Sequence, residues 1–389
     1  MDSTKTLIIG NLFDGKNCNF CHGWLMEENG RICALGQGSP DVQVDANYID
    51  ATGKYVLPGL IDGHNHLFLD PGSFESMSQE APDNMLARMQ RNASAHLHNG
   101  VTAIRECGTP HYLDVKLKGQ INRGEVPGPE LLVSGEWITS PRGHGAFPGC
   151  AEIVQGEKDI REAVKRIVDG GAEFIKVMVT GGNATKWSPP EKSFFDLAEL
   201  SALADEAAKH GKKVSAHVHS SEGARNSVLA GIQMIEHGSL ITDDETIELI
   251  RKHDVIWVFN QHQRIADPDP KMPDYKRKRT LEGRERSKIA VQKAIEAKIR
   301  MCTGCDGYHQ NSAMVWAMEG MVQSGATDAQ ALLMGTYTPG MAFFGGKRGV
   351  LEVGAHADVI VCGENPLENI STLRQLSLVM KEGVIIKKA

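Results

Sequence analysis

The sequence lacks long hydrophobic runs, a cationic leader and any excess of basic charge. No apolar stretch in its 389 residues approaches the roughly 18 that a membrane-spanning helix requires. The first residues, MDSTKTLIIGNLFDGKN, contain no cationic segment followed by a long apolar one, so we expect no signal peptide. Lys and Arg number 42 against 49 Asp and Glu, and this net charge of -7 disfavours a dedicated binder of nucleic acid or anionic membranes. We therefore expect neither nucleic acid nor a membrane as a partner.

Cysteine is also scarce, with 8 residues in a chain of this length. Without a secretion signal, so few cysteines indicate reduced thiols and a cytoplasmic protein. Charged residues make up 23% of the chain and hydrophobic residues 41%, which excludes wholesale disorder. Glycine is abundant instead, with 41 residues, and this indicates many tight turns between short elements. The composition predicts a soluble α/β protein.

Strand-like and helical segments alternate through the middle of the chain. Runs such as FIKVMV and VIWVF are apolar along their whole length, which is typical of strands in a parallel sheet that helices cover on both sides. Eight such units over about 250–300 residues fit a (β/α)8 barrel, and no G-x-G-x-x-G motif follows an early strand, as a dinucleotide-binding fold would need. The strand candidates are Val56–Asp62, Val101–Glu106, Glu130–Ser134, Phe174–Val179, Lys213–His217, Ile232–Glu236, Val255–Phe259 and Lys298–Gly304. The helix candidates are Asp83–Asn99, Asp159–Asp169, Asp196–His210, Glu222–Ala230, Asp244–Lys252, Glu285–Ala297 and Thr327–Met334.

The two ends of the chain have a different pattern from the middle. Residues 1–55 and 347–389 contain short alternating runs punctuated by glycine, which predict strands and hairpins. We expect both ends to form one small β-sandwich domain beside a barrel of residues 56–346. Within the barrel, residues 262–288 contain three prolines and the basic cluster Lys276–Arg279. This segment predicts a loop or lid over the exit of the seventh strand, and a solvated surface excursion is an equal alternative.

Candidate metal ligands fall at the C-terminal ends of the predicted strands, where barrels of this kind place their active sites. His64 and His66 end the first strand, and because strand side chains alternate, both imidazoles can point into the barrel mouth. His217, His237 and Asp306 follow the fifth, sixth and eighth strands. Neutral His is the commonest metal ligand in proteins. Each residue alone fits a structural role equally well, but that explanation fails for residues gathered at the same end of several strands.

Lys176 lies at the centre of the apolar run FIKVMV. An ammonium group in a fully covered strand is costly unless it is paired or neutralised, so a purely structural lysine is the weaker interpretation. A buried neutral amine acts as a nucleophile or forms a Schiff base. It can also take up CO2 to become a carbamate, whose two oxygens bind metals as a carboxylate does. With the histidines and Asp306, such a lysine supplies donors for two Zn²⁺-like ions that keep open positions for water.

Five segments, in chain order, resemble the amidohydrolase superfamily. They are VLPGLIDGHNH, FIKVMVTGG, AHVH, IEHG and GCDG, and the final GVLEVGAHADVIVCGENPLEN resembles the return of that family's chain into its β-domain. The resemblance spans essentially the whole chain and implies a (β/α)8 barrel with a small β-sandwich built from both termini.

The resemblance also implies a ligand set for two divalent metal ions, which we expect to be Zn²⁺. By that resemblance His64, His66 and Asp306 hold one metal ion. His217 and His237 hold the other, and a carbamylated Lys176 bridges the two.

The closer likeness is to the imidazolonepropionase-like and Xaa-Pro or Xaa-Arg/Lys dipeptidase branch. It rests on KVMVTGG, on the loop RGHG (142–145) and on the segment from VSAHVH to MIEHG. In that branch the corresponding residues lie near the substrate, which implies His144 and His219. Arg105 is a further candidate to anchor a substrate carboxylate or oxyanion, and an ion pair with a nearby acid is its alternative. The sequence departs from the branch at RECG (105–108) and at Cys305, where Arg-Asp with paired glycines and Thr are usual.

These residues predict a binuclear metal-dependent hydrolase that cleaves a C–N bond of a small molecule. We expect the substrate to be a dipeptide or an N-acyl amino acid, and the enzyme to be a homo-oligomer. Two cations lower the pKa of a shared water to about 7, which makes it a nucleophile at neutral pH. Asp306 would accept the proton of this water and pass it to the leaving amine, because an amide nitrogen leaves poorly unless it is protonated.

Four alternatives remain open. The same metal site would hydrolyse a cyclic amide, a carbamate or a lactone. A deaminase usually has a Glu three residues past the strand-5 His, where this chain has Ser220, and the nearest Glu is Glu222. A catalytically inactive scaffold is disfavoured by the complete ligand set. A zinc module built from CNFC (18–21) and CTGC (302–305) is disfavoured because the pairs lie nearly the whole chain apart.

Overall fold

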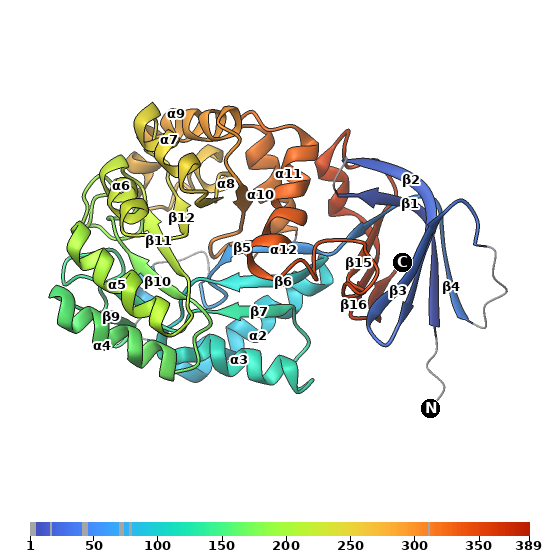
Figure 1. Cartoon of the computed structure of the whole chain (residues 1–389), viewed down its shortest axis with the longest axis horizontal. Coiled ribbons are helices and arrows are strands. Elements are labelled where there is room, and N and C mark those ends of the chain that lie inside the picture. Colours follow the sequence, from blue (N-terminus) through green and yellow to red (C-terminus); the bar gives the residue numbers. More distant parts are fainter. Residues whose placement is uncertain (1–4, 16–17, 41–45, 70–73, 78–79, 310–311) are drawn as a thin grey trace.

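The structure, a computed structural model, describes residues 5–15, 18–40, 46–69, 74–77, 80–309 and 312–389. In Figure 1 the middle of the chain forms a large body in which helices surround strands. Strands from both ends of the chain form a smaller body at its side, where both termini lie. Among the described residues, no helix combines the length and the apolar character needed to cross a membrane.

The terminal strands from both ends of the chain form one seven-stranded sheet in the order β17-β16-β15-β4-β1-β2-β3. They are β1 (Lys5–Asp14), β2 (Asn19–Glu28), β3 (Arg31–Gln37), β4 (Ala46–Pro58), β15 (Val359–Cys362), β16 (Leu376–Lys381) and β17 (Val384–Lys388). The sheet curls back on itself, because the backbone amide of Ile32 in β3 donates to the carbonyl of Ala355, 3.0 Å away and just ahead of β15. Ile8, Leu25 and Met380 are buried in the core that the curled sheet encloses. The expected β-rich part built from both termini is therefore present.

The middle of the chain forms the predicted (β/α)8 barrel. Its strands are β5 (Leu60–Asn65), β6 (Val101–Glu106), β7 (Glu130–Val133), β10 (Ile175–Met178), β11 (Val214–Val218), β12 (Met234–His237), β13 (Ile256–Phe259) and β14 (Met301–Thr303). Neighbouring strands are parallel within β5-β6-β7 and from β10 to β14. Two backbone hydrogen bonds join these arcs into a ring, from Glu173 N to Val133 O at 2.8 Å and from Asp306 N to His64 O at 2.9 Å. The first strand candidate, Val56–Asp62, is divided between two sheets, because β4 pairs with β15 up to Pro58 before β5 begins.

Two short strands that the sequence pattern did not predict follow β7. They are β8 (Trp137–Thr139) and β9 (Ala151–Ile153), which pair with each other in parallel. Ile138 of β8 also pairs with Val177 of β10, so the segment between the third and fourth barrel strands is held against the sheet. This pairing fixes the loop that carries His144.

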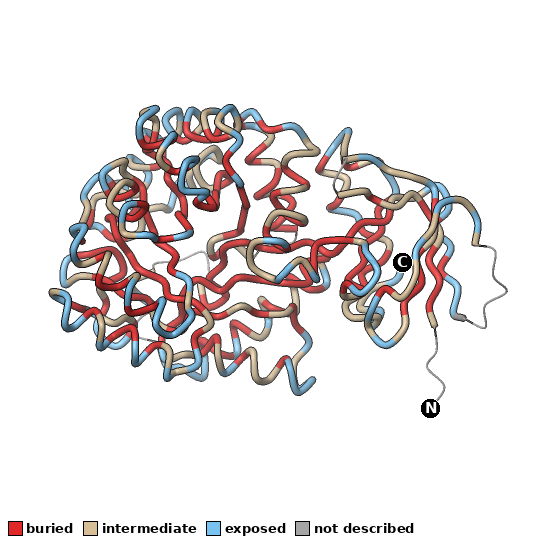
Figure 2. Tube along the Cα trace, viewed as in Figure 1, coloured by how far each residue is buried: buried red, intermediate tan, exposed pale blue. Residues whose placement is uncertain are grey.

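Helices cover the barrel from outside, and Figure 2 shows buried residues along the strands with exposed residues on the outer faces of the helices. Helix α4 buries Ile160 and Ile167, among others, as its 3.6-residue periodicity predicts. Helix α5 begins with a capping box, in which Asp196 Oδ1 accepts from Glu199 N at 2.9 Å. The helices are α1 (Phe74–Met77), α2 (Pro82–His98), α3 (Leu113–Asn122), α4 (Gly156–Asp169), α5 (Leu197–Lys209), α6 (Ser221–Leu229), α7 (Asp244–Lys252), α8 (His262–Ile265), α9 (Asp274–Glu296), α10 (Ala313–Val322), α11 (Asp328–Met334) and α12 (Tyr337–Phe343), with short 3-10 turns at Pro110–Tyr112 and Ile370–Arg374.

The prediction of a loop over residues 262–288 is wrong. The segment contains the short helix α8 and most of α9, and the basic cluster Lys276–Arg279 lies in the first turns of α9. The three prolines all precede α9, and the residues from 274 to 296 contain none, so nothing prevents a helix there. The side chains that α9 buries are mostly small, among them Ser287 and Ala290, so its apolar periodicity is weak in the sequence.

Candidate metal centre

Five of the side chains predicted to bind metal meet at the C-terminal mouth of the barrel. Asp306 Oδ1 lies 3.3 Å from His64 Nε2 and 3.8 Å from His66 Nε2, and Asp306 Oδ2 lies 3.9 Å from His237 Nδ1. The ring of His217 completes the group, with its centroid 4.5 Å from that of His237. These residues come from β5, β11 and β12 and from the turn after β14, so strands far apart in the sequence supply one site.

Two of these residues have an unusual backbone. His237 has φ +69° and Asp306 has φ +49°, in the left-handed region that residues other than glycine seldom adopt. Such conformations gather at functional sites, where the surrounding structure enforces them. Gly304 contributes to this enforcement, because a Cβ at that position would lie 2.5 Å from the backbone nitrogen of His64. The turn after β14 therefore sits directly against β5, and this contact brings Asp306 to the histidines.

Lys176 projects from β10 into the same region. It is fully buried and stands in register with Ser215 of β11, while Met178, two residues on, stands beside His217. Its Nζ has no hydrogen-bond partner among the described residues. A buried amine without a partner is costly, which indicates that the partner of Lys176 is a group from outside the chain.

Three of the four candidate ligand histidines, His66, His217 and His237, are held neutral. Burial, together with the neighbouring His64, lowers the pKa of His66 to about 3. Burial likewise holds the pKa values of His217 and His237 well below the ordinary value. Burial alone would raise the pKa of Asp306, but the neighbouring His64, whose own pKa is raised, keeps the pKa of Asp306 well below the usual range. Neutral imidazoles beside an ionised carboxylate are the donor set that binds a divalent cation.

The sequence interpretation missed Glu236, which lies beneath the site and orients His64. Its Oε2 is 2.6 Å from His64 Nδ1, and its Oε1 accepts from Arg105 Nη1 at 2.7 Å and from the Ser215 hydroxyl. Burial lowers the pKa of His64, but Cys107 and Glu236 outweigh burial and leave it raised. A carboxylate that holds one ring nitrogen of a metal-binding histidine fixes the other nitrogen toward the metal. The signal was present in the sequence, because Glu236 interrupts an apolar strand just as Lys176 does.

The expectation that Arg105 anchors substrate is wrong. Its side chain is fully buried in the barrel, where it pairs with Glu236 and donates to the carbonyl of Gly63 at 3.2 Å. Its guanidinium group also lies over the rings of Phe174 and Phe343, 4.4 Å and 4.7 Å from their centroids. With these partners Arg105 supports the site from below and has no face toward a substrate. The ion pair left open as an alternative is the correct interpretation.

The other two substrate-binding candidates, His144 and His219, lie against the metal-ligand candidates. The ring of His144 stacks on that of His217 with centroids 4.5 Å apart, and its Nδ1 is 2.8 Å from the Thr185 hydroxyl. The ring of His219 stacks on that of His237 at 5.1 Å, and its Nδ1 is 2.8 Å from the Ser239 hydroxyl. Both histidines border the centre, and their role in binding substrate stays a prediction.

The residues present fit a divalent cation. His64 Nε2, His237 Nδ1 and Lys176 Nζ are buried polar atoms with no hydrogen-bond partner in the part of the chain that the structure describes. Ligand atoms of His64, His66 and Asp306 all lie within 4.8 Å of one another, close enough for one ion to bind all three.

Other groupings of cysteine, histidine and acid carry no such signal. Asp62, His96 and Cys305 also lie together, but Asp62 already accepts from the backbone of His64 and Cys305 at 3.1 Å each and from Asn65 Nδ2 at 2.8 Å. The zinc-module alternative fails as well. The CNFC segment (18–21) lies at the start of β2 in the terminal sheet, whereas CTGC (302–305) is buried in the barrel.

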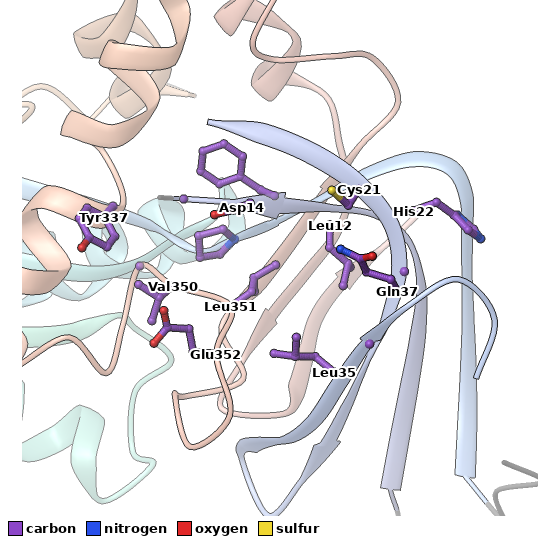
Figure 3. A pocket seen from close by; sticks show the side chains of 16 residues that line it. Leu12, Asp14, Cys21, His22, Leu35, Gln37, Tyr337, Val350, Leu351 and Glu352 are labelled. Carbon is purple, nitrogen blue, oxygen red and sulfur yellow. The ribbon is translucent and has the colours of Figure 1, made fainter. Parts of the chain in front are cut away.

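A separate cavity of about 230 Å³ lies where the terminal sheet meets the barrel. Figure 3 shows Leu12, Cys21, Leu35 and Gln37 on the strands of the sheet, with Tyr337 and the segment 350–352 facing them. None of the predicted site residues lines this cavity. It therefore forms part of the junction between the two bodies and is distinct from the candidate centre.

The fold and the donor set define a class of barrel hydrolase. Residues 55–386 match the model of the amidohydrolase family, and the chain therefore belongs to that family. It is a hydrolase that acts on carbon–nitrogen bonds, of the amide type. Enzymes of this family generally use divalent metal ions, in agreement with the ligand groups described above.

The chain is similar in sequence or in structure to several individual proteins. The chain is 26% identical to ochratoxinase of Aspergillus niger over 370 residues, which cover 85% of this chain and 75% of that protein. The crystal structure of that ochratoxinase has a TM-score of 0.90 at 25% identity and covers 100% of this chain and 97% of its own. A prolidase solved with N-methylphosphonate-L-proline has a TM-score of 0.92 at 24% identity over 99% of this chain and 100% of its own. A Xaa-Pro dipeptidase structure has a TM-score of 0.87 at 24% identity over 98% and 99%. The last two show the shared fold.

Proposed function

We propose that this protein is a binuclear metal-dependent amidohydrolase that cleaves the amide bond of a dipeptide or an N-acyl amino acid. The proposal rests on the convergence of four histidines and the ionised Asp306 around the buried amine of Lys176, which has no hydrogen-bond partner among the described residues. The prolidase and Xaa-Pro dipeptidase neighbours share its fold and act on dipeptides by their names, which supports this choice of substrate.

The ligands divide into two groups. His64, His66 and Asp306 would hold one cation, and His217 and His237 the other. Lys176 would bridge them after its neutral amine adds to CO2 and loses a proton, which forms a carbamate. Two bound divalent cations, for which we propose Zn²⁺, supply a water of lowered pKa and polarise the carbonyl of the substrate.

Asp306 moves the proton. Its carboxylate is ionised at neutral pH and lies among the ligands, so it can accept a proton from the attacking water. It then delivers that proton to the amide nitrogen, which leaves as a neutral amine. Its contact with His64 Nε2 at 3.3 Å and the left-handed backbone at Asp306 hold the carboxylate in this position.

The protein surface around His144 favours an apolar group on the substrate. The ring of Phe74 stacks on that of His144 with centroids 5.9 Å apart, and Phe147 and Trp187 extend the aromatic contact. His144 and His219 would bind the carbonyl oxygen or a neighbouring polar group beside this aromatic wall. Deamination is disfavoured, because Ser220 caps helix α6, and Glu222 is exposed in its first turn.

The test is a screen of metal-replete enzyme against dipeptides and N-acyl amino acids with apolar, aromatic, basic and prolyl side chains. Cyclic amides, carbamates, lactones and amino-purines form the comparison arms. We expect release of free amino acid from at least one open-chain amide, and loss of that activity in His237→Asn. Turnover confined to a comparison arm would contradict the proposal.

A further inference from the structure

Arg264 in helix α8 is a partly buried cation that forms no ion pair with an acid among the described residues. Its Nη2 lies 3.5 Å from His219 Nε2, and this long contact is the one hydrogen bond of its side chain among the described residues. Burial lowers the pKa of Arg264 to about 10, so the group stays charged at neutral pH. A guanidinium group has five N–H donors, and most of those of Arg264 are left for something outside the chain.

Two buried arginines of this protein, in contrast, have acidic partners. Arg105 is paired with Glu236, and Arg348 is paired with Asp358 and Glu382. A buried charge without a counter-ion is unfavourable, and the fold supplies an acid to each of these two arginines. Arg264 forms no ion pair among the described residues, and the carboxylate whose charge acts on it is that of Asp306 in the candidate metal centre.

Arg264 is also held firmly in place. Its backbone carbonyl accepts from Arg284 Nε at 3.3 Å, and its backbone amide donates to the carbonyl of Gln261 at 2.9 Å. The preceding residue, Gln263, donates from Nε2 to the carbonyl of Asp306 at 2.8 Å. The segment that carries Arg264 is therefore fastened to the turn that carries Asp306, which fixes the backbone of Arg264 relative to the centre.

The first turns of α9 add positive charge to the same side. Burial lowers the pKa of the Lys276 ammonium, and this group has no ion pair in the described part of the chain. Arg279 donates to the carbonyls of Gly182 and Thr185 at 3.0 and 2.9 Å, which fastens α9 over the loop after β10. The charges of Arg264 and Lys276 lie close enough to act on each other, and together they raise the local concentration of anions.

We propose that Arg264 binds the carboxylate of the substrate, so that the enzyme requires a free acid on the amino-acid side of the bond that it cleaves. The inference rests on the proposed amidohydrolase function and specifies its substrate class. A planar guanidinium group matches a carboxylate in a bidentate manner, which would orient the amide toward Asp306. His219, in contact with both Arg264 and the ring of His237, lies between the carboxylate site and the metal ligands.

The experiment compares two substrates that share one scissile bond. They are the best carboxylate-bearing substrate of the screen and the same compound with that carboxylate converted to a primary carboxamide. We expect the wild type to prefer the acid. Arg264→Met should lower kcat/KM for the acid by about 10- to 100-fold, the loss expected for a charge-assisted hydrogen bond. It should change kcat/KM for the carboxamide by no more than about threefold.

Two further variants exclude a merely structural role. Arg264→Lys keeps the charge and should retain part of the preference for the acid. Arg277→Met removes an exposed arginine that pairs with Asp274 on α9, and should leave both substrates unchanged. Metal content, measured for each variant, should stay at the wild-type level.

Equal hydrolysis of acid and carboxamide by the wild type would overturn the inference, whatever the variants do. An equal loss on both substrates in Arg264→Met would also overturn it, because that result assigns Arg264 to the positioning of His219. In both cases amide hydrolysis itself remains, so the proposed function survives. If no open-chain amide is hydrolysed, the proposed function fails and the inference fails with it.

Discussion

The terminal sheet and the barrel mouth both bury charged groups, but they satisfy them differently. Beside the sheet, in the segment between α12 and β15, Arg348 is 4% exposed and donates to the carboxylates of both Asp358 and Glu382. In the barrel mouth, Lys176 Nζ and His64 Nε2 have no hydrogen-bond partner among the described residues. Where the chain supplies every partner, the charges stabilise the fold. Where buried polar groups have no partner within the chain, they indicate a binding site for a ligand.

The largest effect is expected from breaking the satisfied network. Arg348→Met leaves Asp358 buried without its cation, so the free energy of unfolding should fall by about 3–5 kcal/mol. Chemical denaturation of the purified variant measures this fall. Hydrolysis per folded molecule should not change, because none of these groups borders the metal centre. The double variant Arg348→Met, Asp358→Leu should recover part of the loss. An Arg348→Met variant of normal stability would contradict the first half of the comparison.

Lys176→Ala tests the unpartnered groups of the barrel mouth. In contrast to Arg348→Met, it should lower activity and metal content and leave stability nearly unchanged. We expect loss of at least about 100-fold in rate, equal to ~2.7 kcal/mol, together with loss of bound metal. The free energy of unfolding of the metal-free protein should not fall to a comparable degree, because the amine has no partner to lose. Lys118→Ala is the matched control, since Lys118 pairs with Glu173 at 2.7 Å. It should keep both metal and rate, and near-normal turnover in Lys176→Ala would dismiss the carbamate.

Glu236 combines both situations. It has a partner within the chain, because it accepts a hydrogen bond from Arg105, and it also orients the candidate metal ligand His64. Glu236→Gln keeps the shape and leaves an acceptor for Arg105, but it removes the negative charge from His64. Metal affinity should fall by about 10- to 100-fold, as it does when the partner of a metal-binding histidine is changed. Competition with a chelator measures this affinity. An unchanged affinity would show that His64 needs no carboxylate to orient it.

The smallest effect concerns acid sensitivity. Burial lowers the pKa of His262 to about 4 from the ordinary 6.5. Between pH 6.5 and pH 4, therefore, His262 is protonated in the unfolded chain but stays neutral in the native state. The stabilisation is complete above pH 6.5 and is lost as the pH falls toward 4, with about 1 kcal/mol lost at pH 5.5. His262→Phe should remove this loss, so its free energy of unfolding should change less between pH 7 and pH 5.5 than that of the wild type. Parallel pH profiles of the two proteins would contradict this prediction.

The sequence predicted the barrel and the convergence of its candidate ligands because both leave local patterns. Parallel strands read as continuous apolar runs, and a lone polar residue within such a run, such as Lys176, stands out. A lone polar residue such as Glu236 also stands out, but the sequence does not indicate which residue pairs with which. Nothing near Arg105 in the sequence indicates Glu236, which lies 131 positions away. Arg264 was hidden for a similar reason, because it lies in a polar segment where the prolines suggested a loop, and only the fold places it beside His219.

The central claim is that the open donors of the barrel mouth hold a pair of cations. Metal analysis of the purified enzyme by inductively coupled plasma mass spectrometry, on wild type and Lys176→Ala in parallel, tests it most directly. We expect two divalent ions per wild-type chain and fewer than two in the variant, with a parallel loss of hydrolysis. A fully active wild-type enzyme without bound metal, or a variant that keeps both ions, would contradict it.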